Sequence, residues 1–506
     1  MASKANEFDQ GQEPLIVEDA STSTTPWTPL FWLPCTFDPV VFTDVMINLI
    51  KNPNINSSWL FRADILHDEE GEDALAGPSP VEYQLQIPSF SGFQCKRYMI
   101  RKLIPRNTLR DDPLDQTCLI YECTAGDERQ TLVVYLPHVS SPDNVPFYHP
   151  KVRGIAFLHR WNAQAAASNI SISYLFFPDL EPTTKLTRTA LHLLTVIGKH
   201  GEGRVTGYVK RVHHDIVIPQ APFQNRYAAL KQKYAKPLID GWAETTDPLK
   251  HVFEDLGIAA FLIELWAGMY ATTITPFPGF VDIGCGNGLL VYILNKEGYA
   301  GWGFDARARK SWETYNTRVV ISGTEQDSLR QSVLVPSVLL PSPSSTTTDP
   351  SLSSTAIHPG LFPQGTFIIS NHADELTPWT PILATLSQSP FVMIPCCSHN
   401  LAGAKYRAPP PKDKTKSESA YSSLVAWVED IARDCGWEVE TEMLRIPSTR
   451  NTALLGRRRR IGGKEFGDEE EEVVVEEMER VVRKYGGAEG WVENAMRLVK
   501  TGPRGH

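Results

Sequence analysis

The residues best suited to chemistry surround a run of glycines in the second half of the chain. The stretch from Phe280 to Asp305 reads FVDIGCGNGLLVYILNKEGYAGWGFD. A short apolar run precedes the glycines, an amphipathic stretch follows them, and a second apolar run ends on Asp305. This order predicts strand, glycine loop, helix, strand and acid, which together form a βαβ unit that can hold a nucleoside. Glycines let the backbone pass close to such a ligand.

The glycine spacing discriminates between two classes of nucleotide cofactor. A dinucleotide fingerprint, G-x-G-x-x-G, would place its third glycine at Leu289. Here the glycines take alternate positions behind an acid, in the pattern D-x-G-x-G-x-G typical of the S-adenosylmethionine (AdoMet) loop of class I methyltransferases. A tight turn in another α/β domain is the alternative, but the acids on both sides favour AdoMet. The predicted cofactor-binding residues on this loop are Asp282, Gly284, Cys285, Gly286, Asn287, Gly288 and Asp305.

A second group of polar residues follows the apolar run 365–371, where the sequence reads NHADE. A hydroxyl that accepts a methyl group benefits from a general base, because free alcohols are weak nucleophiles. The predicted catalytic residues are His372, Asp374 and Glu375, while Asn371 is assigned to the cofactor side. Helix capping is the alternative role for the two acids, and His372 could equally be a structural turn residue. His399, after the next strand, is a further candidate.

Composition leaves the class of partner open. A chain of 506 residues is long enough for two or more domains, and its formal charge of −10 argues at first against nucleic acid. Much of the acid, however, lies in one block from Asp468 to Glu479. Basic residues alternate with aromatic ones from Lys199 to His214 and from Arg226 to Lys236. These stretches are either a phosphate-contacting surface or solvated helix faces.

The cysteines and the N-terminus point to a reduced, intracellular protein. The eight cysteines lack CxxC or CxxxH spacing, and the adjacent pair Cys396-Cys397 is a poor joint ligand for one ion, so no metal site is expected. The stretch from Met1 to Thr25 is polar and lacks the apolar core of a signal peptide. No apolar run is long enough to span a membrane.

The predicted fold class is α/β. A class I, Rossmann-like methyltransferase domain with a doubly wound, mostly parallel sheet is expected over residues 271–460. A disordered N-terminus (1–25), a β-rich α+β region (26–198) and a basic helical linker (199–270) precede it, and a charged tail (461–506) follows. Strands are expected from residue 81 to 180, after an acidic loop at 67–80.

Three finer predictions concern local structure. Asp38 is expected to cap a helix that has Pro39 at its first position and ends at Lys51. A basic helix is expected from Arg307 to Arg318. A Ser/Thr/Pro-rich insertion of about residues 323–364 obscures the third strand of the sheet, for which 332–335 is the candidate.

Several ordered motifs over roughly residues 225–457 resemble those of the eukaryotic tRNA (uracil-2′-O-)-methyltransferases. They are KYAKPLIDGWAETTDPLKHVFEDLGIAAFLIELW, VDIGCGNGLLVYILNKEGYAGWGFDARARKSW, SNHADELTPW, IPCCSHN and LRIPSTRN. The resemblance implies AdoMet-dependent methylation of the ribose 2′-hydroxyl of uridine 44 in serine tRNA, in the cytoplasm, with no membrane and no identifiable obligate protein partner. It also implies that the NHADE turn faces the acceptor. The resemblance does not assign the base, for which Asp374 is the candidate chosen from the residues of the turn.

The long insertion and the charged tail depart from this family pattern, and the cysteine/histidine zinc finger of some relatives is not seen. Two alternatives stay open. One is a methyltransferase that acts on another RNA or on protein. The other is a non-catalytic AdoMet-binding scaffold in RNA processing.

Overall fold

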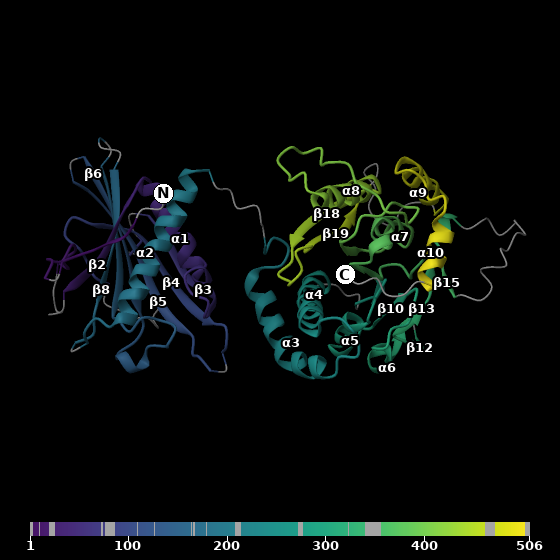
Figure 1. Ribbon diagram of the computed structural model, residues 1–506, viewed down its shortest axis with the longest axis horizontal. Coiled ribbons are helices and arrows are strands. Elements are labelled where there is room, and N and C mark those ends of the chain that lie inside the picture. Colours follow the sequence, from purple (N-terminus) through teal and green to yellow (C-terminus); the bar gives the residue numbers. More distant parts are fainter. Residues whose placement is uncertain are drawn as a thin grey trace, which may run out of the picture. The chain divides into compact units, whose positions relative to one another are not determined.

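The computed structural model describes residues 4–9, 11–19, 26–71, 74–75, 87–108, 110–125, 127–162, 164, 167–178, 180–207, 214–271, 277–321, 323–339, 356–460 and 471–500. The chain divides into two compact units, Met1–Arg211 and Val212–His506 (Figure 1). No helix among the described residues has the length and apolar character needed to cross a membrane.

The first unit is built on an eight-stranded antiparallel sheet with the order β1-β2-β8-β7-β6-β5-β4-β3. Its strands are β1 (Asn6–Glu7), β2 (Trp27–Cys35), β3 (Leu60–Glu70), β4 (Gln94–Pro105), β5 (Leu114–Ala125), β6 (Glu128–Pro137), β7 (Gly154–Asn162) and β8 (Ala167–Leu175). The helices α1 (Pro39–Lys51) and α2 (Thr184–Val205) pack on one face of the sheet (Figure 1). The strands expected between residues 94 and 177 are confirmed, whereas the one expected at 81–87 lies almost wholly outside the described residues.

The start of α1 confirms the predicted cap. The backbone amide of Val41 donates to Asp38 Oδ1 at 2.9 Å, and Pro39 occupies the first helical position. The helix then buries one face against the sheet, with Phe42 and Met46 fully buried. Because the cap is a local interaction between residues three apart, the sequence alone was enough to predict it.

Two predictions of irregular structure in this unit are wrong. Within the stretch predicted to be disordered, Asn6 and Glu7 pair with β2, and Ile16 is buried against the second face of the sheet. That face of the sheet is apolar, so residues that shield it from water are stabilised. The polar composition of residues 1–25 does not reveal that Ile16 takes this role. Residues 67–70, predicted to be loop, belong to β3. Arg97 of β4 reaches across the strands to bind Asp68 and Glu70, so these acids are paired.

The second unit is built on a seven-stranded sheet with the order β13-β10-β9-β16-β17-β19-β18. Its five parallel strands are β9 (Phe280–Ile283), β10 (Gly301–Asp305), β13 (Leu329–Gln331), β16 (Phe367–Asn371) and β17 (Phe391–Ile394). The strands β18 (Trp437–Met443) and β19 (Thr452–Arg459) form the expected antiparallel hairpin at one edge.

Helices cover both faces of this sheet. Three of them, α3 (Gln220–Asp240), α4 (Pro248–Tyr270) and α5 (Leu289–Lys296), share one apolar core. On the other face a second core includes α7 (Thr380–Leu386), α8 (Ala420–Asp434), α9 (Glu471–Lys484) and α10 (Trp491–Lys500). The helix expected before the glycine loop is α4, and it packs against the sheet as predicted.

The structure places the third strand and the insertion differently from the prediction. The third strand is Leu329–Gln331, just before the expected 332–335, and Val333–Leu334 (β14) pairs with Ile357–His358 (β15) instead. A hairpin of β11 (Arg318–Ile321) and β12 (Thr324–Asp327) precedes it. Strands this short carry no periodic signal, and pairing with β10 decides which residues form the strand. The Ser/Thr/Pro-rich centre of the insertion, 340–355, lies outside the described residues.

Three further differences are decided by packing. The predicted basic helix after Asp305 is reduced to α6 (Trp312–Tyr315), because Arg318 already begins the hairpin. Helix α2 continues to Val205, so the predicted linker 199–270 is shared between the two units. The predicted charged tail contains two helices, α9 and α10, that bury an apolar face on the second core. That face includes Met478 and Trp491, so the two helices belong to the folded core of the second unit.

Candidate active site

A cavity of about 890 Å³ opens at the carboxyl ends of the parallel strands of the second unit. Side chains after β9, β10, β16 and β17 line it, together with residues of α4, of α10 and of the turn between β18 and β19. The cavity brings together the predicted donor and acceptor residues Asp282, Gly284, Cys285, Gly286, Asn287, Asp305, Asn371, His372, Asp374 and Glu375. Open α/β sheets bind their ligands at this end of the strands.

Gly288 is the one predicted cofactor residue outside this lining. Its φ is +76°, and a Cβ there would come within 2.4 Å of the Leu329 side chain in β13. It therefore lets the start of α5 pack closely on the sheet. Gly286 also has a positive φ, of +53°, but its Cβ position faces open space beside the cavity. Gly288 is thus required for close packing, whereas a side chain at position 286 would meet no neighbouring atoms.

Asp305 holds the glycine loop in place. Its Oδ2 accepts a hydrogen bond from the amide of Gly286 at 3.1 Å, and its Oδ1 accepts one from the amide of Arg307 at 3.1 Å. Burial raises the pKa of Asp305, while the Arg309 guanidinium, 3.9 Å away, and these two amides act in the opposite direction. The side chain of Asn287 has a structural role as well, because its Oδ1 accepts from the Leu289 amide at the start of α5.

Sequence reasoning missed two acids of α4 that line the cavity, Glu254 and Asp255. Burial, followed by the nearby charge of Glu254, raises the pKa of Asp255 to about 8. Burial and the charges of Asp255 and Asp305 likewise hold the pKa of Asp282 well above its usual value. The available signal was an adjacent pair of acids inside an otherwise apolar helix, since carboxyl groups are rarely buried without a function or a partner.

The buried acids leave unsatisfied polar atoms at the cavity. Asp282 Oδ1 and Asn371 Oδ1 are both buried and have no hydrogen-bond partner among the residues that the structure describes. Asn371 donates through its Nδ2 to Asp255 Oδ1 at 3.4 Å. Unpaired acceptors beside ionisable carboxyls suit a cationic ligand group, because such a group would supply donors and positive charge. The amino group of the methionine part of AdoMet has this chemistry, so the residues present fit AdoMet.

The NHADE turn has an unusual backbone. His372 and Asp374 have φ values of +50° and +44°, which are uncommon for residues other than glycine and are often found at functional sites. His372 Nε2 lies 2.9 Å from Glu254 Oε1, and Cys396 Sγ donates to Asp374 Oδ1 at 2.8 Å. Glu375 lies close to the buried His399, with 3.7 Å between Oε1 and Nε2.

Basic side chains also line the cavity, but they lie outside the two stretches in which basic and aromatic residues alternate. The cavity-lining cations are Lys250, Arg307, Arg309, Lys310 and Arg450. In the predicted basic stretch of α3, Arg226 binds Glu264 at 2.8 Å and Lys233 binds Glu297 at 2.7 Å. These pairs favour the solvated-face interpretation of α3, whereas residues 208–213 of the other stretch lie outside the described part of the chain.

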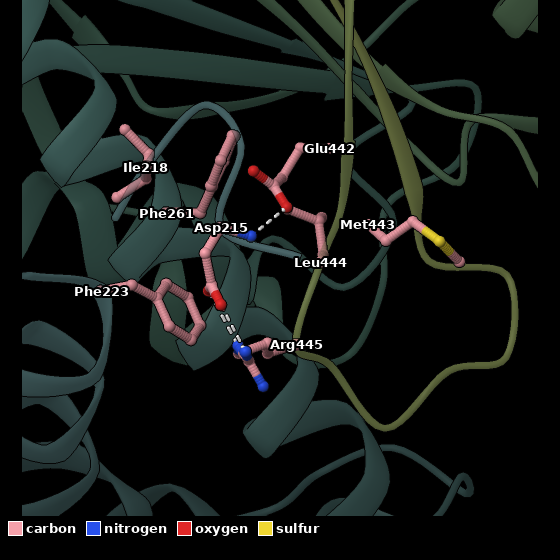
Figure 2. A pocket seen from close by; sticks show the side chains of 8 residues that line it. All are labelled: Asp215, Ile218, Phe223, Phe261, Glu442, Met443, Leu444 and Arg445. Carbon is pink, nitrogen blue, oxygen red and sulfur yellow. Dashed lines mark hydrogen bonds and ion pairs between the residues drawn. The ribbon is translucent and has the colours of Figure 1, made fainter. Parts of the chain in front are cut away.

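A second cavity, of about 10 Å³, serves structure and not ligand binding (Figure 2). The carboxylate of Glu442 accepts hydrogen bonds at 2.8 Å from the amides of Asp215, Ile216 and Val217. Arg445 binds the Asp215 carboxylate through two nitrogens (Figure 2). A space this small holds at most one water molecule, so it is not a ligand site. The hydrogen bonds around it attach the start of the second unit to the end of β18.

Comparisons with known proteins agree with this division of the chain. Residues 6–211 match the family model described as "TRM44-like, N-terminal bet v1-like domain", and residues 217–336 match "Predicted AdoMet-dependent methyltransferase". The second match contains the glycine loop and Asp305.

Curated relatives extend the likeness over nearly the whole chain. A protein of Neurospora crassa is 56% identical over 496 residues, which cover 96% of each chain. A protein of Debaryomyces hansenii is 37% identical over 99% of each chain, and one of Yarrowia lipolytica is 38% identical over 97% of this chain and 99% of its own. All three are named tRNA (uracil-O(2)-)-methyltransferase. The chain therefore belongs to the tRNA (uracil-O(2)-)-methyltransferase family.

Proposed function

We propose that the protein transfers the methyl group of AdoMet to the ribose 2′-hydroxyl of a uridine in tRNA. The observation that carries this proposal is a shared cavity. Asp282 and Asp305 of the donor loop and His372 of the NHADE turn line the same space, so donor and acceptor can meet there. The names of the relatives supply the substrate, and the geometry supplies a place for the reaction.

We assign the second unit to the class I, Rossmann-like methyltransferases. Numbered within the seven-stranded sheet, the strands are arranged 3-2-1-4-5-7-6, with the seventh antiparallel to its neighbours. The glycine loop follows the first strand, and Asp305 ends the second. This arrangement supports a nucleoside-binding domain in which the adenosine lies across the ends of these two strands.

Residues on both sides of the loop would hold AdoMet, whose sulfonium supplies an electrophilic methyl group. Asp282 and Asp255 would accept the cationic amino group, and Asn371 Oδ1 is a further acceptor beside them. Asp305 would accept hydrogen bonds from ribose hydroxyls, because its carboxylate lies at the end of β10. Cys285 and Asn287 would contribute their backbone and the shape of the loop, since the side chain of Asn287 already accepts a hydrogen bond from the Leu289 amide.

The acceptor hydroxyl must lose its proton as the new bond to carbon forms. Among the proposed catalytic residues, His372 has the geometry of an oriented general base. If Nε2 carries the proton toward Glu254, then Nδ1 keeps a lone pair that can accept the hydroxyl proton. Asp374 is bound by Cys396, and Glu375 lies beside His399, so these two acids are better placed to shape the acceptor site.

The cations around the cavity would bind the phosphates of the RNA backbone. The cavity is lined by Lys250 of α4 and by Arg307 and Lys310, which follow β10. Cations on both of these segments could contact successive phosphates of an RNA strand that passes over the donor site. Uridine 44 of serine tRNA and a cytoplasmic location are the finer parts of this proposal, and they depend on the family resemblance alone.

A transfer assay tests the proposal. The purified protein is incubated with labelled AdoMet and tRNA that lacks ribose methylation, and the tRNA is then digested to nucleosides. Label in 2′-O-methyluridine is the expected result. Label in another nucleoside would assign the enzyme to a different substrate atom. AdoMet binding without any transfer would contradict catalysis and favour a scaffold role.

A further inference from the structure

Three side chains with metal-binding atoms converge at the edge of the acceptor side of the cavity. Within the described part of the chain, one oxygen of Asp374 and the sulfurs of Cys396 and Cys397 lie within 4.8 Å of one another. The parallel pairing of β16 and β17 brings them together, because Asn371 lies opposite Ile394. The residues that follow these two strands therefore leave the sheet side by side.

The donor set suits a borderline-soft divalent ion. Two thiolates and a carboxylate match the ligands of catalytic zinc sites, which use three protein groups and keep the fourth position open. With zinc–sulfur and zinc–oxygen bonds of about 2.3 and 2.0–2.2 Å, tetrahedral ligands lie roughly 3.5–3.8 Å apart. Cys396 Sγ is 2.8 Å from Asp374 Oδ1, and all three atoms fall within 4.8 Å, so small rotations would bring them to this spacing.

The charges nearby also balance. Two thiolates and one carboxylate carry three negative charges, of which a divalent ion neutralises two. Arg450 Nη1 donates to Cys397 Sγ at 3.4 Å, and its guanidinium supplies the remaining positive charge from the turn between β18 and β19. An arginine next to a ligating sulfur both orients the ligand and stabilises its ionised form.

The position of the cluster suggests what the open coordination site would meet. The large cavity is lined by Asp374, Cys396 and Arg450. Asp374 adopts a left-handed backbone conformation in the NHADE turn. A fourth ligand would therefore come from the cavity as an oxygen of water or of an acceptor hydroxyl.

We propose that Asp374, Cys396 and Cys397 bind one zinc-type divalent cation, with a fourth position open to the cavity. This site departs from the sequence-based expectation of no metal. The fold brings the sulfurs of the two adjacent cysteines within 4.8 Å of each other and adds a carboxylate from the neighbouring strand, and cysteine spacing reveals neither feature. The metal site stands on its own geometry, whereas its use in binding the acceptor hydroxyl rests on the proposed function.

Metal binding is tested without AdoMet or tRNA, so a failed transfer assay leaves the result unaffected. The full chain is freed of metal with a chelator, titrated with Zn²⁺ or Co²⁺, and analysed by mass spectrometry of its metal content and by absorption spectroscopy. One ion per chain and a thiolate-to-cobalt charge-transfer band are expected. Cys396→Ser and Cys397→Ser should each lose most of the band, and Cys123→Ser, in the first unit, should keep it.

A measurement on the unaltered chain guards against variants that fail to fold. Alkylation of Cys396 and Cys397, mapped by peptide mass spectrometry, should slow at least tenfold when Zn²⁺ is present, while alkylation of Cys123 should not change. Absence of the charge-transfer band, or equal alkylation rates with and without Zn²⁺, would overturn the proposal. Retention of the full band by both serine variants would overturn it as well.

Discussion

The imidazole of His372 lies 2.9 Å from the carboxylate of Glu254, and this pair joins the turn after β16 to helix α4. Glu254 is 6% exposed, so the interaction is shielded from water and orients the ring firmly. The relationship resembles the way in which a buried carboxylate positions a catalytic histidine, and it connects a residue predicted from the sequence to one that was missed.

Replacement of this histidine should separate catalysis from cofactor binding. We expect His372→Ala to lower kcat by about 10²–10⁴-fold, the usual contribution of a general base, and to leave AdoMet affinity nearly unchanged. Glu254→Gln should lower kcat by a smaller factor, because it weakens the contact that orients the ring and leaves the imidazole itself in place. Steady-state kinetics with tRNA would measure both effects, and His200→Ala, in α2, is the matched control. Normal turnover by His372→Ala would return this residue to a structural role.

Removal of the Asp305 carboxylate should weaken AdoMet binding. Asp305→Ala removes the proposed ribose contact and also the acceptor for the Gly286 amide, so the loop loses its support. Isothermal titration calorimetry should show at least a tenfold increase in Kd. Asp240→Ala, which breaks an exposed pair with Lys236, should leave Kd unchanged. Equal affinities for the two variants would exclude Asp305 from the donor site.

Binding of AdoMet should release protons below pH 8. The pKa of Asp255 is raised to about 8 by burial and by Glu254, so the free protein holds this carboxyl protonated at neutral pH. A cationic ligand group favours the ionised form, which means that affinity should rise with pH and level off near pH 8. Calorimetry in buffers with different ionisation enthalpies would measure the released protons.

The raised pKa of Asp255 should also make the stability of the protein depend on pH. Between the ordinary pKa of an aspartate and a folded-state pKa of about 8, the native chain binds more protons than the unfolded chain. The contribution of Asp255 to stability therefore falls as pH rises through this range. Asp255→Asn should flatten the pH dependence of both AdoMet affinity and melting temperature. If Asp255→Asn keeps the full proton release, then Asp282, whose pKa is also raised, is the group responsible.

A side chain at Gly288 should destabilise the second unit. Gly288→Ala combines a left-handed backbone with a contact of 2.4 Å to Leu329, and it is expected to lower the free energy of unfolding by about 1–3 kcal/mol or more. Gly298→Ala has the same kind of backbone, with φ of +91°, but its Cβ meets nothing within 4 Å. The difference between the two variants in chemical denaturation isolates the clash with β13. An equal loss in both would show that backbone strain alone is responsible.

The Glu442 contacts should contribute measurably to stability (Figure 2). Glu442→Gln removes the charge from a buried group that accepts three amide hydrogen bonds, and we expect a loss of about 1–3 kcal/mol. Glu438→Gln, on the same strand, disturbs pairs with the exposed Arg458 and Arg460 and should cost much less. Thermal unfolding of the two variants would compare them, and a similar melting temperature for both would contradict the buried-carboxylate argument.

Local interactions explain which parts of the fold could be predicted. The cap at Asp38, the glycine loop and the strands of the first unit depend on residues close together in the chain, so their patterns are legible in the sequence. The third strand was misplaced because three residues have no period, and only the pairing of Leu329 with Gly303 defines it. The packing of the C-terminal tail could not be predicted for a related reason. Its charged residues dominate the composition, while Met478 and Trp491 find a core that only the folded sheet provides.

The amino-acid sequence was enough to identify the cofactor class and the family, because glycine spacing and ordered motifs are properties of the chain alone. It also placed Asp282, Asp305 and His372 at or near the carboxyl ends of predicted parallel strands, which lie at the same edge of a sheet. The groups that complete the site could be identified only in the folded protein. Glu254 and Asp255 come from a helix that packs beside the sheet, and Cys396 meets Asp374 across two parallel strands. Such contacts join residues that are 22 or more positions apart, and their chemistry depends on burial and proximity that arise only on folding.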